Sequence, residues 1–253
     1  MNDFHSRLEE NELLFLRGHR SAVYDLGFGS LYISSDAKPL TWNFAGALRA
    51  GADSQDSTID RTVAFFTDWN RTPCLKVTPA SEPEGWEAAL TRRGWAPRVR
   101  LNHMVLNRVE STTNPDVHVR LCSTDEDLRA FSRTQCEGFG VPEWIEWVHK
   151  INVINSRRDD QRFYIAELES RFVGVSLLVS AHRVGGLYAV ATDPEARGRG
   201  VARALIACAA ADSGKLGNEI LCLNTVAGGA AETVFRGAGF VDVFESRFYV
   251  PAQ

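Results

Sequence analysis

The segment from Ala191 to Ala202, ATDPEARGRGVA, constrains the fold more than any other stretch of the sequence. An apolar run ends at Thr192, a short loop supplies two arginines and two glycines, and a helix of small residues is predicted over 201–212. Glycine lets the backbone approach a ligand closely, and the first amides of a helix have no partners inside it. With the helix dipole and the guanidinium charges, the segment predicts a phosphate or pyrophosphate site. For a lone G-x-G, a tight turn with solvated arginines is the plainer interpretation.

Two familiar nucleotide-binding loops do not fit this spacing. A Walker loop requires a lysine after its last glycine, and no lysine follows Gly200. A dinucleotide-binding fingerprint requires a third small residue where Arg203 stands, early in a βαβ repeat rather than two-thirds along the chain. Both alternatives are therefore excluded.

Strands and helices alternate around the loop. Apolar alternation predicts strands, and cap residues followed by acids predict helix starts. The expected order is strand, two helices, three strands, helix, strand, helix, strand, which predicts an α/β fold on a mixed sheet. The expected strands are 117–121, 163–167, 172–179, 186–192, 219–224 and 240–250, and the expected helices are 123–138, one beginning near 142, 201–212 and 230–236.

Composition excludes several classes of protein. Hydrophobic residues make up 44% and charged residues 24%, as in an ordinary soluble globular protein. A formal charge of −4 gives no global basic field for nucleic acid, and no apolar run approaches the roughly 18–20 residues of a membrane span. The five cysteines form no C-x-x-C pair, and the histidines have no zinc-site spacing. We therefore expect a cytoplasmic protein with reduced thiols and no metal, as a monomer or homodimer, with neither nucleic acid nor membrane as partner.

The pattern R-x-x-G-x-A runs from Arg197 to Ala202, directly after an apolar strand. Downstream follow a further strand, 220–224, and the run AETVFRGAGF, 231–240, which ends a short helix in a Gly-Phe turn. Together these features resemble the GNAT superfamily of acyl-CoA N-acyltransferases. The resemblance covers roughly residues 116–253.

The resemblance implies acetyl-CoA as co-substrate and assigns residues to it. Backbone amides from Gly198 through Arg199, Gly200 and Val201 to Ala202, with the side chain of Arg197 or Arg199, would hold the pyrophosphate. Free backbone groups of Ala189, Val190 and Ala191 would bind the pantetheine arm and polarise the acetyl carbonyl. Asn224 would hydrogen-bond the same arm or simply end its strand.

The sequence departs from the family pattern at the catalytic acid, the residue that protonates the leaving thiolate. Many relatives carry a tyrosine in the terminal helix that protonates the leaving thiolate, and Phe235 stands at that position. A phenyl ring donates no proton, so Tyr188 and Tyr249 are the candidate substitutes. For each, a half-buried strand aromatic is the simpler interpretation.

The sequence also departs from the family pattern at the general base, the residue that accepts the proton of the amine. Relatives that use a glutamate place it near Val184 on the cofactor strand, where this chain has none. Glu137 is the first candidate and Glu143 the second, because they flank the loop 138–142, although a solvated surface acid is the simpler identity of either. His149, His182 and a water relay remain open. Trp144 and Trp147 share a helix face, which suits core packing or an aromatic wall for an apolar or cationic acceptor.

An internal repeat is expected at an offset of 145 residues. The run WEAALTRRGW, 86–95, aligns with AETVFRGAGF, 231–240, and the strands before and after align as well. We therefore predict a degenerate GNAT-like domain over 1–110 without the phosphate loop, a linker over 111–115, and an acetyltransferase domain over 116–253.

The sequence thus predicts an N-acetyltransferase that transfers an acetyl group directly to an amine, more readily a small molecule than a protein lysine. The alternatives are a non-catalytic acyl-CoA-binding module, an acetyltransferase of protein amines, and a nucleotide-phosphate binder of another fold.

Overall fold

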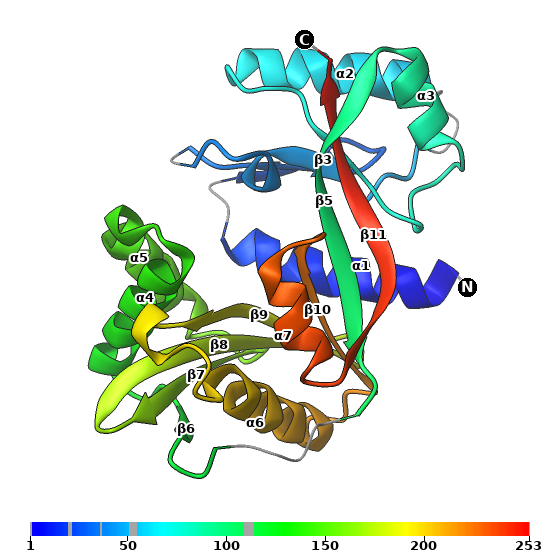
Figure 1. Ribbon diagram of the computed structural model, residues 1–253. Coiled ribbons are helices and arrows are strands. Elements are labelled where there is room, and N and C mark those ends of the chain that lie inside the picture. The colour runs from blue at the N-terminus through cyan, green and yellow to red at the C-terminus, as the bar shows by residue number, and fades with distance from the viewer. Residues whose placement is uncertain (1, 20–21, 36, 51–54, 109–113, 253) are drawn as a thin grey trace. The chain divides into compact units, whose positions relative to one another are not determined.

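The computed structural model describes residues 2–19, 22–35, 37–50, 55–108 and 114–252 (Figure 1). The chain divides into two compact units. Unit 1 contains Met1–His103, Thr225–Gly229 and Val243–Gln253, and unit 2 contains Met104–Asn224 and Ala230–Asp242. The units are thus discontinuous in sequence, and residues 111–113 of the expected linker lie outside the described residues. The domain boundaries inferred from sequence stay a prediction.

Unit 2 is built on a mixed sheet. The strands β6 (His118–Leu121), β7 (Gln161–Leu168), β8 (Arg171–Ala181) and β9 (Val184–Thr192) pair antiparallel in that order. The next strand, β10 (Ile220–Val226), pairs parallel with β9. The predicted α/β class with a mixed sheet is confirmed.

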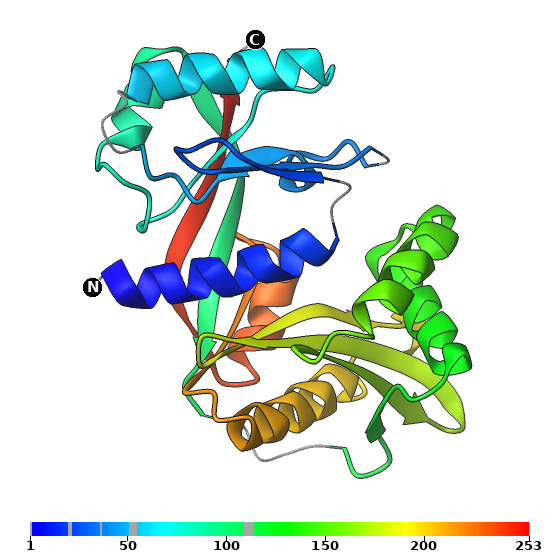
Figure 2. The same cartoon turned by 180° about the vertical axis from the view of Figure 1, so that it is seen from behind.

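Helices cover both faces of this sheet. Helix α6 (Val201–Lys215) packs on β8 and β9, and α4 (Asp125–Phe139) packs on the same two strands from the other side, with α5 (Ile145–Asn155) beside it (Figures 1 and 2). The short helix α7 (Ala230–Arg236) precedes the last strand. Two 3-10 turns, η2 (Pro142–Trp144) and η3 (Pro194–Ala196), complete the unit. No described helix combines the length and apolar character that a membrane span requires.

Helix α4 begins at a reciprocal cap. The hydroxyl of Thr124 accepts a hydrogen bond from the Asp127 amide at 3.1 Å, and the Asp127 carboxylate accepts one from the Thr124 amide at 3.2 Å. The capping box satisfies two amides that the helix cannot pair itself, so the start of α4 is set locally.

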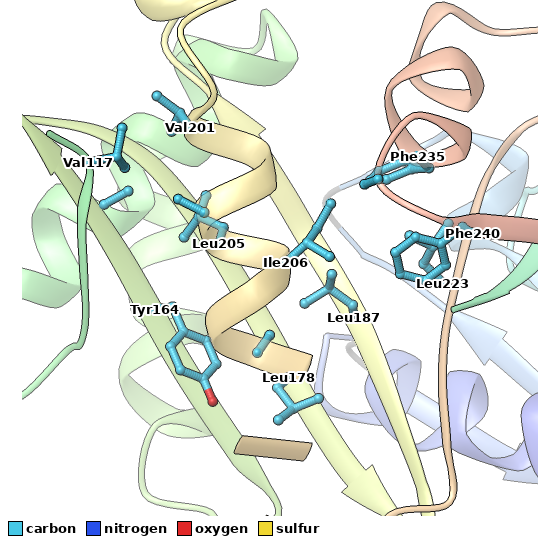
Figure 3. Packing of buried hydrophobic residues seen from close by; sticks show 14 of the residues in the cluster. Val117, Tyr164, Leu178, Leu187, Val201, Leu205, Ile206, Leu223, Phe235 and Phe240 are labelled. Carbon is cyan, nitrogen blue, oxygen red and sulfur yellow. The ribbon is translucent and has the colours of Figure 1, made fainter. Parts of the chain in front are cut away.

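The core of unit 2 lies between α6 and the sheet. Figure 3 shows Val201, Leu205 and Ile206 directed at side chains from the strands, Leu178 and Leu187 among them. A Cβ on Gly174 in β8 would lie 2.3 Å from Val201 Cγ1, so α6 approaches the strand closely only because that position is glycine.

Unit 1 holds the remaining strands in the order β1-β2-β3-β4-β11-β5. The neighbours β1 to β3 pair antiparallel, β3 with β4 parallel, and β4 with β11 antiparallel. The strands β5 and β11 also contribute residues to unit 2. The elements are α1 (Asn2–Gly18), β1 (Ala22–Asp25), β2 (Ser30–Ile33), η1 (Leu40–Trp42), β3 (Phe44–Gly46), α2 (Gln55–Asp68), β4 (Leu75–Val77), α3 (Trp86–Arg92), β5 (Trp95–Leu106) and β11 (Phe240–Pro251).

The element order agrees with the offset expected from sequence. Strand β5 begins and ends 145 residues before β11, and the helices α3 and α7 precede them. Two antiparallel pairs lead to one parallel pair in unit 1, and three antiparallel pairs lead to one in unit 2. This order supports a repeat, while the common origin of the two halves stays a prediction.

A buried charge network lies in the interior of unit 1. Lys76 is fully buried and pairs with the carboxylate of Glu12, and Thr78 donates to Glu9 at 3.0 Å. His103 Nε2 lies 2.9 Å from Ser246 Oγ and 3.9 Å from Glu12. Burial lowers the pKa of His103 to about 4 and raises the pKa of Glu9.

Candidate functional site

The arginine–glycine loop connects β9 to α6 as the sequence predicts. Asp193 caps η3 by accepting from the Glu195 amide at 2.9 Å, and the chain then passes through Gly198 at φ +77° and Gly200 at φ +84°. Both values lie in the left-handed region that favours glycine. Gly200 is the N-cap of α6 and gives it no side-chain cap.

The start of α6 therefore leaves a row of amides without acceptors. The first helical bond runs from Ala204 N to the carbonyl of Gly200 at 3.1 Å. The amides of Gly198, Gly200, Val201, Ala202 and Arg203 have no hydrogen-bond partner among the described residues. Five free donors at the positive end of a helix form a cradle for a doubly anionic group such as a pyrophosphate.

The strands next to the loop separate. Pairing between β9 and β10 runs from Val184 and Ile220 to Gly186 and Cys222, and no later pair joins the two strands in this fully described region. On its other side, β9 shifts register against β8 between Val175 and Leu177, and Ala189 adopts φ +51°. The bulge leaves Ala189 and Val190 without register partners in β8, whereas Ala191 pairs with Val175, and all three lie beyond the last pair with β10. The sequence predicted the pantetheine site at these three residues.

The residue Asn224 lies on the other side of this separation. It is half-buried in β10, two residues beyond the last pair with β9. A strand that has lost its neighbour presents unpaired groups, so Asn224 and the 189–191 segment border the same opening between the strands.

In unit 1 the backbone just beyond β3 is hydrogen-bonded to another segment of the chain, around Glu82. Beyond β3, the amide of Ala50 donates to the carbonyl of Glu82 at 3.0 Å, and the amide of Glu82 donates to Leu48 at 2.9 Å. Ala47, just before them, has φ +53°, much like Ala189. Among the described residues, the backbone of Glu82 thus pairs with the segment just beyond β3.

The side chain of Arg197 joins the loop to the end of α4. Its Nη2 donates to the carbonyl of Gly138 at 2.8 Å. A Cβ on Gly138 would lie 2.9 Å from the Cβ of Ala191 and 3.2 Å from the Thr192 carbonyl. The end of α4 is therefore packed closely against β9, and only glycine allows that approach.

The side chain of Arg199 is engaged by a different element. Its Nη1 donates to Glu169 Oε2 at 3.1 Å, and its Nη2 donates to Oε1 of the same carboxylate. This hydrogen-bonded pairing lowers the pKa of Glu169. The carbonyl of Arg199 accepts from Asn114 Nδ2 at 2.9 Å, and Asn114 also lies against Gly200.

The proposed acids are placed in different units. Tyr188 is buried in β9, paired with Leu177 and adjacent to Ala189, so it lies in the same segment as the expected acyl site. Tyr249 belongs to unit 1, in β11 opposite Leu75. Burial raises the pKa of Tyr249, and Glu87 raises it further. Of the two tyrosines, only Tyr188 lies in the strand that leads into the loop.

The position of the family's tyrosine is filled by a core residue. Phe235 in α7 is buried and packs edge-on against Phe240, with 6.0 Å between ring centroids (Figure 3). It contributes apolar burial to the α6 core. Its ring contributes no titratable group.

Two glutamates near the end of α4, Glu137 and Glu143, lie close to the buried thiol of Cys136. Glu137 is exposed on the last turn and directly precedes Gly138, and Glu143 is exposed in η2. Burial, together with the charges of Glu143 and Glu137, raises the pKa of Cys136 to about 11. The thiol is therefore neutral near pH 7, while Glu137 stays accessible beside the cofactor strand.

The remaining sequence candidates lie in two places, the η2–α5 region and the β8–β9 turn. The rings of Trp144 and Trp147 contact edge-on with centroids 5.7 Å apart. His149 in α5 keeps a buried Nδ1 without a hydrogen-bond partner in the described residues. His182 lies in the β8–β9 turn at φ +53°. No group of three or more described His, Cys, Asp or Glu side chains is arranged to hold a metal ion.

The geometry of this loop and sheet agrees with comparisons to known proteins. Residues 159–242 match the family model described as "Acetyltransferase (GNAT) domain". That range includes β9, the arginine–glycine loop, α6, β10 and α7. The chain thus carries a GNAT acetyltransferase domain, and the resemblance inferred from the loop is confirmed. No curated protein matches the sequence.

Solved structures share the fold over nearly the whole chain. A GCN5-related N-acetyltransferase from Kribbella flavida is similar with a TM-score of 0.72 at 13% identity, covering 98% of this chain and 96% of that one. One from Sphaerobacter thermophilus is similar with a TM-score of 0.62 at 16% identity, covering 89% and 81%. A protein of unknown function from Staphylococcus epidermidis has a TM-score of 0.62 at 12% identity, covering 91% and 93%. At these identities the likeness shows the fold.

Proposed function

We propose that this protein transfers an acetyl group from acetyl-CoA directly to the amine of a small molecule. One observation carries the proposal: β9 separates from β10 beyond Gly186 and then leads into the loop whose amides at Gly198, Gly200, Val201, Ala202 and Arg203 are free. A pyrophosphate acceptor and an opening for an extended thioester arm are the two features that a bound acyl-CoA requires.

The pyrophosphate would be held mainly by backbone. The amides of Gly198, Gly200, Val201 and Ala202 supply donors without any rearrangement. The side chain of Arg197 or Arg199 would add charge, after exchanging its present acceptor for phosphate oxygens. That exchange costs Arg199 little, because its ion pair with Glu169 is exposed to solvent.

The thioester would lie along β9. Acetyl-CoA supplies an activated acyl group, and the amine's lone pair attacks its carbonyl carbon. The developing oxyanion needs fixed donors, and the backbone groups of Ala189, Val190 and Ala191 are the candidates. As the C–S bond breaks, the thiolate leaves and the amine nitrogen gives up a proton.

The proton steps require groups other than Phe235. Tyr188 is the candidate acid, because it lies in the same strand segment as the proposed oxyanion donors. Glu137 is the candidate base, because it is exposed beside Gly138, which packs on Ala191. Tyr249 remains the second candidate for the acid. Cys136, with a pKa of about 11, is not an acyl-accepting thiolate near pH 7, which favours direct transfer.

The experiment is a thiol-release assay with acetyl-CoA over small amines and a lysine peptide. We expect turnover with at least one small amine and less with the peptide. Replacing both Arg197 and Arg199 by alanine should weaken acetyl-CoA binding severely. A variant with Arg129 and Arg133 on α4 replaced by alanine is the matched control, because it loses the same charge at an exposed face.

Two results would overturn the proposal. Tight acetyl-CoA binding without turnover on any amine favours a non-catalytic acyl-CoA-binding module, an alternative suggested by Phe235 at the acid position. Unchanged acetyl-CoA affinity in the Arg197/Arg199 variant would show that neither arginine helps to hold the coenzyme.

A further inference from the structure

Asn114, a residue of the expected linker, reaches the arginine–glycine loop from 85 positions away in sequence. Its Nδ2 donates to the carbonyl oxygen of Arg199 at 2.9 Å. Among the described residues, that carbonyl accepts no other hydrogen bond. The amides of Arg197 and Arg199 lie 3.4 Å from their acceptors within the loop, beyond the usual range of about 2.7–3.2 Å. The bond from Asn114 is therefore the best-formed hydrogen bond to the backbone of Arg199.

The direction of the peptide between Arg199 and Gly200 decides where the Gly200 amide points. In a trans peptide the carbonyl oxygen and the N–H point to opposite sides. Because Asn114 holds the Arg199 carbonyl on its own side, the Gly200 N–H is directed away from Asn114, and it has no partner among the described residues. A Cβ on Gly200 would lie 3.2 Å from Asn114 Cβ, so Asn114 also occupies that side of the loop. An anion would therefore approach from the opposite side, where the Gly200 N–H is a donor.

The same peptide has a second accessible direction. Gly200 has φ +84°, and glycine adopts φ of either sign at little cost, so the peptide can turn over when nothing holds its carbonyl. In the reversed direction the Arg199 carbonyl oxygen would replace the Gly200 N–H at the start of α6. A carbonyl oxygen repels an anion, so only the direction that Asn114 stabilises suits a pyrophosphate.

Asn114 is itself anchored to the core of unit 2. Its Oδ1 accepts from the Asp116 amide at 3.0 Å, and its carbonyl accepts from the Val117 amide at 3.2 Å. Val117 is buried and belongs to the same hydrophobic cluster as Val201, the first residue of α6 (Figure 3). Asn114 and the start of α6 are thus fixed to one core, which makes Asn114 a held donor rather than a solvated side chain.

We propose that Asn114 is a positioning residue for the pyrophosphate site. Its side chain sets the direction of the Arg199–Gly200 peptide and so keeps the Gly200 amide available to the anion. This inference rests on the proposed function, because it assumes that the loop holds the pyrophosphate of coenzyme A. It assigns a role to a residue that acts through another and lies outside the range 159–242 matched by the family model.

The test is isothermal titration calorimetry of coenzyme A with the full chain and two serine variants. Asn114→Ser loses the amide donor without a change of charge, and its hydroxyl can still accept from the Asp116 amide. We expect it to bind coenzyme A about fivefold more weakly, the equivalent of one net hydrogen bond. The matched control is Asn218→Ser, which removes an amide that donates to Ser180 at 2.9 Å and to Ser213 at 3.1 Å. Asn218 follows the other end of α6, so the affinity should stay unchanged.

A spectroscopic measurement separates positioning from a simple loss of stability. In a ¹H–¹⁵N spectrum of protein labelled at glycine, the signals come from 20 glycines, and the Gly200 signal is the one that Gly200→Ala removes. Asn114→Ser should shift the Gly200 signal before any coenzyme A is added, whereas Asn218→Ser should leave it in place. Adding coenzyme A to the unaltered chain should also shift it, because the amide then donates to the anion.

Three results would overturn the inference alone. These are equal coenzyme A affinity in Asn114→Ser and the unaltered chain, equal weakening in Asn114→Ser and Asn218→Ser, and an unshifted Gly200 signal in Asn114→Ser. If the unaltered chain does not bind coenzyme A, the proposed function fails and this inference fails with it. The two failures are distinguishable, because the affinity of the unaltered chain is measured separately from that of the variants.

Discussion

The guanidinium of Arg197 donates to the carbonyl oxygen of Gly138 across 2.8 Å, although 59 residues separate them in sequence. The contact ties the loop that begins α6 to the last turn of α4. Gly138 in turn packs on Ala191, so the arginine–glycine loop, β9 and the end of α4 are in direct contact with one another.

Enlarging Gly138 should therefore disturb the site. In Gly138→Ala the new Cβ would lie 2.9 Å from Ala191 Cβ, which forces α4 away from β9. We expect a loss of about 1–3 kcal/mol in unfolding free energy and weaker acetyl-CoA binding, measured by chemical denaturation and calorimetry. Gly214→Ala in α6 meets no atom within 4 Å and should gain about 0.4–1 kcal/mol. Equal effects in the two variants would contradict the tight packing.

The two loop glycines should respond differently to alanine. Gly198 has φ +77° and open space around a Cβ, so Gly198→Ala costs only backbone strain, about 1 kcal/mol. Gly200 has φ +84° and a Cβ there would approach Asn114 to 3.2 Å, so Gly200→Ala should cost more and displace the helix amides. Thermal unfolding and acetyl-CoA titration check the order. A larger effect at Gly198 would be inconsistent with Asn114 as a support of the loop.

The α6 core should dominate the stability of unit 2. Leu205 is fully buried between α6 and the sheet (Figure 3), and Leu205→Ala should lower the unfolding free energy by about 2–5 kcal/mol. Val234→Ala in α7 removes a side chain that is 47% exposed and should change it by no more than about 0.5 kcal/mol. Urea denaturation measures both, and a loss below 1 kcal/mol for Leu205→Ala would be unexpected.

Acid should destabilise unit 1 through His103. Its pKa is lowered to about 4 by burial, whereas an unfolded histidine titrates near 6.5. Below pH 6.5 the unfolded chain binds a proton at this histidine that the folded chain does not bind. The unfolding free energy is therefore highest above pH 6.5 and decreases as the pH falls toward 4, by up to ~3 kcal/mol. In His103→Gln the fall in melting temperature between pH 6.5 and 4 should become smaller.

A second titrating group provides the control for that experiment. Hydrogen bonding to Arg120 lowers the pKa of Asp127. The contribution of Asp127 to the unfolding free energy is therefore kept above about pH 4 and is lost only as the pH falls further. Asp127→Asn should therefore leave the slope between pH 6.5 and 4 unchanged. If His103→Gln also leaves it unchanged, His103 is not the cause.

Removing the hydroxyl of Tyr188 tests the acid assignment. Tyr188→Phe keeps the buried ring and should lower kcat about 10²-fold with a smaller change in KM, because general acid catalysis acts in the transition state. Tyr249→Phe is the comparison, since that ring lies in unit 1. Full activity in Tyr188→Phe with loss in Tyr249→Phe would transfer the role to Tyr249.

Local sequence information was enough for the elements and for the loop. The glycines at 198 and 200 adopt the left-handed conformation, α6 begins at Val201, and β9 ends at Thr192, because turns and helix starts depend on neighbouring residues. Strand alternation likewise predicted the mixed sheet, and the family resemblance followed from the loop and the Gly-Phe turn.

The partners of the loop could not be predicted in this way. Asn114 lies beside Gly200, Glu169 pairs with Arg199, and Gly138 accepts from Arg197, but each belongs to a distant element and is an unremarkable residue in its own stretch. The ion pair between Glu87 in α3 and Arg247 in β11 likewise joins residues 160 positions apart.

The sequence by itself determined the α/β elements, the phosphate-type loop and the GNAT family of the domain, because these depend on short-range patterns of glycine, charge and apolar side chains. Only the tertiary structure decided which groups stay unpaired: the amides at the start of α6 and the separated backbone of β9. Whether a polar group has a partner depends on which distant segments pack against it, and no local pattern specifies that packing.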